Sequence, residues 1–583
     1  MTGLGSSISK RGSASSSDSA LHGLSLSRKI GLVPPGWDRL DQAATVEEFS
    51  GLMAMAMDLA GRNWGNTEGE EFAGLMTSEM SRHSAILCAL EVYRQQPFRL
   101  VEATLTEIQA ALESGKVSSR ELVRVYLDRI KTFDVQGPQI KAMLFINPGA
   151  LSQAEELDQE RRMRGSRGVL HGIPIVVKDN YGTSDMPTTC GTCVLKSFFP
   201  SSDADVVKKL RQAGAIILGK SNLHELALFG TTYSSLGGQT RNPYDLTKTP
   251  GGSSGGTGAA VSANFAAAGT GTDAVNSVRS PASANNLVGI RPTKGLVCLE
   301  GIMPVSRTQD NAGPIARTVL DAAVLLEIMI GNGWRCTDDL IDDLRGIRIG
   351  VLRSFWGTDT IHAEVNGVSE SALRVMRDLG AVVVDVATPE LDADQLLGDL
   401  DVQRFEIKHE LERYFALHQA PVKSFAQLLG AGPHDSLTAS FLQTVQAIED
   451  PLQQPEYRSR LQRIELLKVR VLEVMDVSRV DVLFYPHQKR VVVDVGENLQ
   501  SDRNGILSAL TGFPSITFPG GFSKPTASAP IGVPIGVEFL SRPHEEAKLI
   551  AIAYRFEQAT HYRRLPPTTP EYGYSQSSVA ATV

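Results

Sequence analysis

The segment most informative about the fold is Pro250-Gly251-Gly252-Ser253-Ser254-Gly255-Gly256-Thr257-Gly258. Its glycines permit close backbone approach and positive φ angles. The segment that follows, up to Ala268, is dominated by alanine, glycine, serine and valine, and such small side chains suit a tightly packed helix. We therefore predict that Ser253 lies in a rigid loop that leads into a buried helix at the centre of the fold. The loop lacks the Gly-Lys-Ser/Thr ending of a phosphate-binding P-loop.

A second serine, Ser277, lies 24 positions further on, in Gly271-Thr272-Asp273-Ala274-Val275-Asn276-Ser277-Val278-Arg279. It follows a strand-like run of small residues, 266–272. Asp273 and Arg279 flank the serine and can pair across the loop, which would hold the loop in shape. Taken alone, Ser277 is also typical of a serine that satisfies backbone groups in a tight turn.

Lys178 follows the apolar stretch Ile173-Pro174-Ile175-Val176-Val177. A lysine in this place either reaches solvent at a strand end or is buried, and burial favours the neutral amine. A neutral amine can accept a proton as a general base. A hydroxyl nucleophile needs such a base, and a second serine with a buried lysine could supply one without any histidine. The three residues together indicate acyl transfer.

Short apolar runs bounded by glycine or proline alternate with helical segments, which favours an α/β protein with a largely parallel or mixed sheet. Buried strands are predicted at 173–177, 215–218, 347–352, 381–386, 480–485 and 515–518. Helices are predicted at 45–61, 69–95, 103–114, 118–132, 203–213, 314–331, 363–379, 399–418 and 455–476. We expect a single large catalytic domain with a central mixed β-sheet flanked by helices, plus an N-terminal helical extension.

These patterns predict four regions along the chain. They are a Ser-rich disordered tail (1–29), an N-terminal helical extension (30–100), a catalytic domain (101–570) and a flexible C-terminal tail (571–583). The first tail weakly resembles an organelle transit peptide, but a solvated tail is the commoner explanation for such a composition. We therefore expect a cytoplasmic protein.

Composition and charge exclude several classes of function. With 583 residues, 42% hydrophobic and 21% charged, the chain is an ordinary globular protein. A net charge of −8 gives no reason to expect nucleic-acid or anionic-membrane binding. Five cysteines, an odd number, fit a reducing compartment. Cys190-Gly191-Thr192-Cys193 has no second pair or nearby histidines, so we expect incidental thiols, no metal and no cofactor.

The ordered set of motifs resembles the amidase signature family, serine hydrolases of amides with a Ser-Ser-Lys triad. The segments that carry the resemblance are 172–174 with 178–180, 219–222, 241–243, 250–256, 271–273 with 277 and 279–281, 289–293, 309–321, 509–519 and 536–559. The match spans residues 101–565, and the number and order of the motifs make chance agreement negligible.

The resemblance implies Ser277 as the nucleophile, Ser253 as a bridging serine on a cis peptide, and Lys178 as the terminal base. Neutral Lys178 accepts a proton from Ser253, which accepts one from Ser277, and Ser277 attacks the amide carbonyl. Asp179 follows the lysine directly and must point away from it, because a carboxylate at the amine would keep the amine charged.

The resemblance also implies an oxyanion hole made by backbone N–H groups of residues 274–277. The oxyanion or substrate-binding residues are then Ala274, Val275, Asn276 and Ala227, and the loop-supporting residues are Asp273 and Arg279. The family usually has two glycines just before the nucleophile, where this chain has Val275 and Asn276. Valine tolerates a positive φ poorly, so either the loop avoids that conformation or its geometry differs.

The leading hypothesis is a stand-alone amidase that hydrolyses a small-molecule carboxamide C–N bond, not a peptide bond. The alternatives are an amidotransferase-type subunit that delivers ammonia to a partner, a tailoring amidase of a biosynthetic pathway, and a degenerate binding protein. The intact triad argues against the last of these. We expect no nucleic-acid partner and no membrane span, and we leave a homodimer open.

The insert 387–455 lies where the family varies, and we expect it near the pocket. Its apolar positions either contact a bulky acyl or aryl group or pack on the core; they are Phe405, Leu411, Tyr414, Phe415 and Leu417. His224 and His487 lie near matched segments, and we interpret both as structural or pocket-lining, since this chemistry needs no histidine.

Overall fold

The computed structural model describes residues 98–338, 340–386, 388 and 390–571. Its contacts divide the chain into two compact units, Met1–Val117 and Ser118–Val583. The predicted tail, the helices predicted at 45–61 and 69–95, and nearly all of the C-terminal tail lie outside the described residues. The domain boundaries inferred from the sequence stay a prediction.

Two helices begin at capping boxes. In the first unit, α5 spans Leu105–Glu113 and follows a capping box formed by Thr104 and Glu107, which satisfies two backbone N–H groups. In the second unit, α6 spans Ser119–Arg129 and has the same arrangement before it. The helices predicted at 103–114 and 118–132 are therefore confirmed, the second continuing into a π-helical turn, Ile130–Val135.

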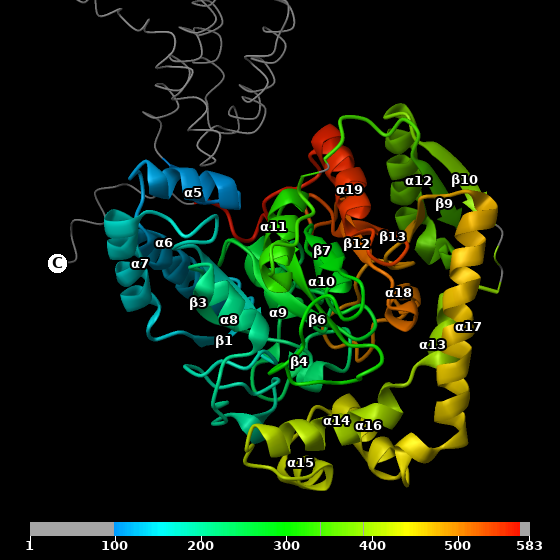
Figure 1. The fold of residues 1–583 in the computed structure, drawn as a ribbon, viewed down its shortest axis with the longest axis horizontal. Coiled ribbons are helices and arrows are strands. Elements are labelled where there is room, and N and C mark those ends of the chain that lie inside the picture. Colours follow the sequence, from blue (N-terminus) through cyan, green and yellow to red (C-terminus); the bar gives the residue numbers. More distant parts are fainter. Residues whose placement is uncertain (1–97, 339, 387, 389, 572–583) are drawn as a thin grey trace, which may run out of the picture. The chain divides into compact units, whose positions relative to one another are not determined.

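An 11-stranded mixed sheet forms the centre of the second unit, with the strand order β1-β3-β2-β6-β8-β7-β12-β13-β11-β9-β10 (Figure 1). Its strands are β1 Met143–Ile146, β2 Pro174–Lys178, β3 Ile216–Ser221, β6 Gly269–Asp273, β7 Val288–Arg291, β8 Asn311–Ala316, β9 Arg348–Leu352, β10 Val382–Val386, β11 Val482–Pro486, β12 Ser515–Phe522 and β13 Pro534–Leu540. β2 runs parallel to β3 and β6, whereas β8, β7, β12 and β13 are antiparallel to both neighbours. This sheet, flanked by helices, confirms the predicted α/β class.

The helix predicted at 314–331 is wrong at its start. Residues Asn311–Ala316 form β8, and α11 begins only at Val319. An apolar run of this length fits a buried strand as well as a helix, and here the ladders to β6 and β7 decide. Gly313 makes the pairing fit, because a Cβ there would lie 1.9 Å from the carbonyl oxygen of Ile290.

Helices pack along the sheet. The outer ones, in contact with one another in this order, are α8 Asp205–Gln212, α11 Val319–Ile330, α19 Glu546–Thr560 and α12 Ala363–Asp378. α9 Gly255–Ser262 and α10 Arg279–Ala284 contact each other and the central strands. α9 is buried along its whole length, and a Cβ at Gly256 would lie 2.2 Å from the carbonyl oxygen of Asn222. The prediction of a buried small-residue helix after Ser253 is therefore confirmed.

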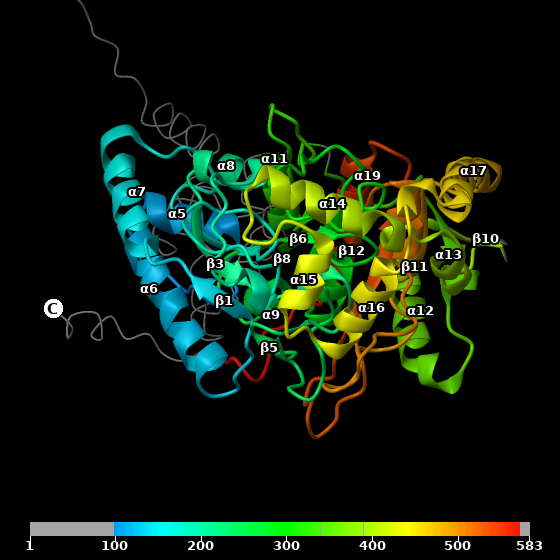
Figure 2. The same ribbon diagram turned by 90° about the horizontal axis from the view of Figure 1, so that it is seen from below.

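The remaining α-helices include those of the insert. They are α7 Ala150–Arg164, α13 Ala393–Leu400, α14 Gln403–Leu417, α15 Phe425–Ala431, α16 Ser436–Gln446, α17 Pro455–Ser478 and α18 Ile506–Thr511. Figure 2 shows α14, α15 and α16 lying together beside the sheet. None of the helices in the described ranges is both long and apolar enough to cross a bilayer.

Candidate active site

Lys178 lies at the end of β2, where the side chain is fully buried. Its Nζ donates hydrogen bonds to Ser253 Oγ and to Thr272 Oγ1, both at 2.8 Å. β6 brings Thr272 there because it is the parallel neighbour of β2. Burial lowers the pKa of Lys178 to about 7, against the smaller opposing effect of nearby acids including Asp273 and Asp310. The amine is therefore able to exchange a proton near neutral pH.

Ser253 lies in the glycine-rich loop before α9, at a cis peptide bond between Gly252 and Ser253. The backbone N–H of His224 donates to the carbonyl oxygen of Ser253 at 3.0 Å. Thr232 Oγ1 donates to the carbonyl of Gly251 at 2.7 Å. These bonds hold both sides of the serine, and the rigidity of the loop stays a prediction.

Ser277 lies on the turn between β6 and α10, and its backbone carbonyl accepts a hydrogen bond from Ser254 N at 3.3 Å. The two serine-bearing loops are therefore neighbours in space. The Ser277 hydroxyl makes no hydrogen bond within the described residues, and the residue is 7% exposed. Such a hydroxyl is free to reach a substrate, and catalytic hydrogen bonds often tighten only once the substrate is bound.

The loop before Ser277 avoids the left-handed conformation, since neither Val275 nor Asn276 has a positive φ. Its carbonyl groups are bonded to groups of the protein: Gln309 Nε2 donates to Ala274 O at 3.0 Å. Arg279 Nη2 donates to Val275 O at 2.6 Å. By contrast, the backbone N–H groups of residues 275–277 donate to no acceptor within the described residues. Valine at 275 is therefore tolerated, and a row of N–H groups stays available.

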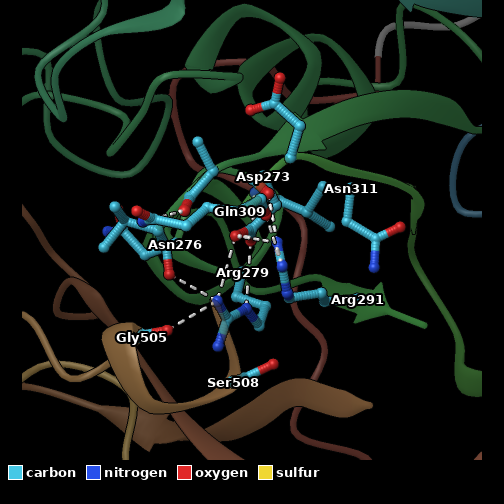
Figure 3. A network of polar contacts seen from close by, with 12 residues as sticks. Asp273, Asn276, Arg279, Arg291, Gln309, Asn311, Gly505 and Ser508 are labelled. Atoms are coloured by element: carbon cyan, nitrogen blue, oxygen red, sulfur yellow. Dashed lines mark hydrogen bonds and ion pairs between the residues drawn. The ribbon is translucent and has the colours of Figure 1, made fainter. Parts of the chain in front are cut away.

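A buried ionic network supports this loop (Figure 3). Arg279 binds both carboxylate oxygens of Asp273 at 3.1 Å, and Arg291 Nη1 lies 3.0 Å from Asp273 Oδ1. Arg279 also pairs with Glu538 on β13. Burial works to raise the pKa of Asp273, but the two guanidinium groups outweigh it and hold the pKa well below its usual range. The predicted Asp273–Arg279 pair is present, and Arg291 and Glu538, which the sequence analysis did not single out, complete it.

Asp179 turns away from Lys178. Its carboxylate lies 2.9 Å from Nζ of Lys220 and accepts a bond from Thr189 N at 3.1 Å. His224 contacts Thr231 Oγ1 at 3.2 Å, and His487 pairs with Glu538. The side chains of both histidines are thus bonded to groups outside the Lys178–Ser253 pair.

A cavity of about 340 Å³ opens beside Ser253, and Val275, Asn276 and Ser277 are not among the residues that line it. Its lining includes Ser253, Thr272, Ala274 and Ala227, and on α14 Glu410, Arg413, Tyr414 and Leu417. Ala227 has a φ of 60°. Of the five apolar positions predicted in the insert, Tyr414 and Leu417 line the cavity, whereas Phe405, Leu411 and Phe415 are buried in apolar clusters.

The sequence analysis also assigned no role to Thr272 or Asn180. Thr272 accepts hydrogen bonds from Lys178 Nζ and from Asn180 Nδ2, the latter at 3.0 Å. The signal was present in Gly271-Thr272-Asp273, where alternation along a strand puts Thr272 and Asp273 on opposite faces. The four cysteines in the described ranges are free, and no group of three or more His, Cys, Asp or Glu there could hold a metal ion.

The chain is similar to known proteins over most of its length. The model of the Amidase family matches residues 121–550. A glutamyl-tRNA(Gln) amidotransferase subunit of Thermoanaerobacter pseudethanolicus is 31% identical over 506 residues, with 80% of this chain and 98% of that protein covered. The crystal structure of the native peptide amidase of Stenotrophomonas maltophilia is 34% identical with a TM-score of 0.72, covering 81% of this chain and 100% of that one. The glutamyl-tRNA(Gln) amidotransferase subunit of Thermotoga maritima has a TM-score of 0.61 at 27% identity, covering 80% and 98%.

Proposed function

The chain belongs to the Amidase family, and we propose that it hydrolyses a carboxamide through an acyl-enzyme on Ser277. One observation carries the roles: a fully buried lysine, Lys178, whose amine is bonded to the hydroxyl of Ser253 and not to a carboxylate. With a pKa lowered to about 7 by burial, this amine can be neutral at neutral pH and accept a proton.

In the acylation step, Ser277 Oγ bonds to the carbonyl carbon while its proton passes to Ser253, whose own proton passes to Lys178. The C–N bond then breaks, and Ser253 returns a proton to the leaving nitrogen while Lys178 gives one back to Ser253. Water attacks the resulting ester by the same relay and releases the carboxylate. The protons balance over the cycle, so the enzyme ends as it began.

The oxyanion is held by backbone N–H groups of residues 274–277. Two observations support this role. The N–H groups of residues 275–277 donate to no acceptor within the described residues. The neighbouring carbonyls of Val275 and Ala274 accept hydrogen bonds from Arg279 and Gln309. Each such donor contributes about 3 kcal/mol to the transition state. The Asp273–Arg279 pair keeps the loop in this position without touching the substrate.

The substrate that we favour is a small or medium carboxamide, not an internal peptide bond. We favour a cytoplasmic location for the enzyme. The cavity of about 340 Å³ beside Ser253 and its wall of α14 support a compact acyl group. An amidotransferase-type subunit is the second candidate, because a 31% identical relative bears that name. In that case ammonia release would require a partner chain. A homodimer stays a prediction.

The test is a panel of aliphatic and aryl amides with the purified chain alone, with ammonia or amine release as the readout. A fluorophosphonate probe should label Ser277, and Ser277→Ala should abolish both labelling and turnover with little change in melting temperature. Turnover by the alanine variant at a large fraction of the wild-type rate would remove Ser277 from the role. Ammonia release only after addition of a partner would favour the amidotransferase.

A further inference from the structure

Two glutamates lie one turn apart on α14 in very different surroundings. Glu406 and Glu410 are four residues apart, so they share one face of the helix, and Tyr414 continues that face. Both glutamates are buried, with exposures of 0% and 4%. A buried carboxylate normally has hydrogen-bond donors, because leaving it without them is costly. The partners of the two side chains therefore show what each does.

Glu406 is fully occupied by the protein. Its carboxylate accepts hydrogen bonds from the hydroxyls of Ser306 and Thr308 and from Tyr457 OH, the last at 2.7 Å. Thr308 N adds a bond at 3.1 Å. Four donors satisfy this carboxylate, which therefore anchors α14 to Ser306, Thr308 and Tyr457.

Glu410 lines the cavity, and no hydrogen bond reaches its carboxylate within the described residues. Its one ion pair there is with Arg413 at 3.9 Å, and that guanidinium is 73% exposed. Such a pair is screened by water and contributes little. The Tyr414 hydroxyl, on the same wall, is also buried and without a partner in the described residues. The Glu410 carboxylate therefore lines the cavity with its hydrogen bonds unmade, whereas the Tyr414 hydroxyl is enclosed by the protein.

The other ionisable groups considered at the cavity do not serve as partners of the Glu410 carboxylate. Arg307 donates to Tyr457 OH at 3.2 Å and lies 3.7 Å from Glu406. His418 stacks on Tyr414, and burial lowers its pKa, so it is neutral at neutral pH. The Asp310 carboxylate accepts two backbone N–H groups of its own loop, at 2.8 and 2.9 Å. Among the described residues, Glu410 is left as the buried carboxylate of the cavity that has no hydrogen-bond donor.

We propose that Glu410 binds a protonated amine in the acyl part of the substrate, so that the enzyme favours amides of amino-substituted acids. The inference rests on the proposed amidase function and names the substrate class of that site. An ammonium group donates three hydrogen bonds and carries the charge that Glu410 lacks a close partner for. The buried setting makes this contact stronger than the exposed pair with Arg413.

The test compares ω-aminoalkanamides of short to medium chain length with n-alkanamides of the same length, in which a methyl group replaces the ammonium. The wild type should prefer the cationic member at its best length. Glu410→Gln should reduce that preference about tenfold to a hundredfold, the size of a hydrogen bond to a charged group. The loss should fall on KM, because the contact is equal in ground and transition states.

Two further variants separate recognition from stability. Arg413→Gln removes the competing cation, so the cationic preference should rise about two- to fivefold. Glu406→Gln changes the same residue type one turn earlier, and it should lower the melting temperature while it affects both substrates alike. If Glu410→Gln leaves the cationic preference unchanged, or lowers both rates equally, Glu410 does not bind the amine.

Binding of n-alkylammonium ions, measured by calorimetry, tests the site without turnover. Wild-type protein should bind them more tightly than Glu410→Gln does, even if no amide in the panel is hydrolysed. Absence of all hydrolysis would contradict the proposed function, whereas equal binding of the ions by both proteins would contradict the amine site.

Discussion

Lys178 and Lys220 are both fully buried, on neighbouring parallel strands, yet they differ in what faces the amine. The register pairs Val177 with Lys220, so Lys178 points to the other side of the sheet. The same alternation sends Asp179 to the side of Lys220, and the two pair at 2.9 Å. Lys178 instead meets the hydroxyls of Ser253 and Thr272.

The difference shows what makes a buried lysine a base. Burial lowers the pKa of both amines, but at Lys220 the Asp179 carboxylate opposes the shift. At Lys178 the partners are hydroxyls, which are neutral, and the pKa falls to about 7. A buried lysine beside a carboxylate stays an ion pair, whereas one beside hydroxyls can lose its proton.

The largest effect on activity should follow removal of the Lys178 amine. Lys178→Met should lower the rate of amide hydrolysis about 10²- to 10⁴-fold, the usual contribution of a general base, without a loss of melting temperature. Lys178→Arg should not restore activity, because guanidinium stays protonated. Steady-state rates and thermal melts of the three proteins check this, and an active arginine variant would rule out Lys178 as the base.

Removal of the Lys220 amine should instead lower the stability of the protein. Lys220→Met leaves the Asp179 carboxylate buried without its counter-ion, so the free energy of unfolding should fall by about 3–5 kcal/mol. Denaturant titration measures this loss. The double variant Lys220→Met, Asp179→Asn should recover part of it, because the unpaired charge is gone. A single variant as stable as the wild type would show that the pair contributes nothing.

The pH dependence of kcat/KM tests the difference between the two lysines without removing either of them. Because protonated Lys178 cannot accept a proton, kcat/KM should fall about tenfold per pH unit below its pKa and level off above it. With the pKa at about 7, the midpoint lies near neutral pH. Asp179→Asn should leave this midpoint in place, since Asp179 pairs with Lys220. A midpoint that moves strongly in that variant would place the carboxylate in the relay.

The smallest effect is expected at Thr272, the second hydroxyl at the Lys178 amine. Thr272→Val removes an acceptor that favours the charged amine, so the midpoint should move to lower pH by less than about one unit, or 1.4 kcal/mol. Thr272→Ser keeps the hydroxyl and should keep the midpoint. The two pH–rate profiles, measured side by side, decide; equal profiles would show that the Thr272 hydroxyl does not tune the base.

Local patterns in the sequence predicted much of this molecule. Apolar runs between glycine and proline located six strands, and the helices predicted at 103–114 and 118–132 are present as α5 and α6. The small residues after Ser253 predicted a buried helix, because such residues pack closely wherever they lie. The strand at Asn311–Ala316 was missed because its short apolar run has no periodicity of its own and depends on strands that pair with it.

The sequence by itself determined the chemistry available: two serines in small-residue loops, one lysine after an apolar strand, and the family whose motifs they complete. The residue pattern alone left open whether Lys178 is buried and what faces its amine, since Thr272, one of its partners, lies 94 residues away in the chain. Nor could it distinguish Glu406 from Glu410, which share one helix face. Burial and partners decide what an ionisable group does, and only the tertiary structure brings those partners together.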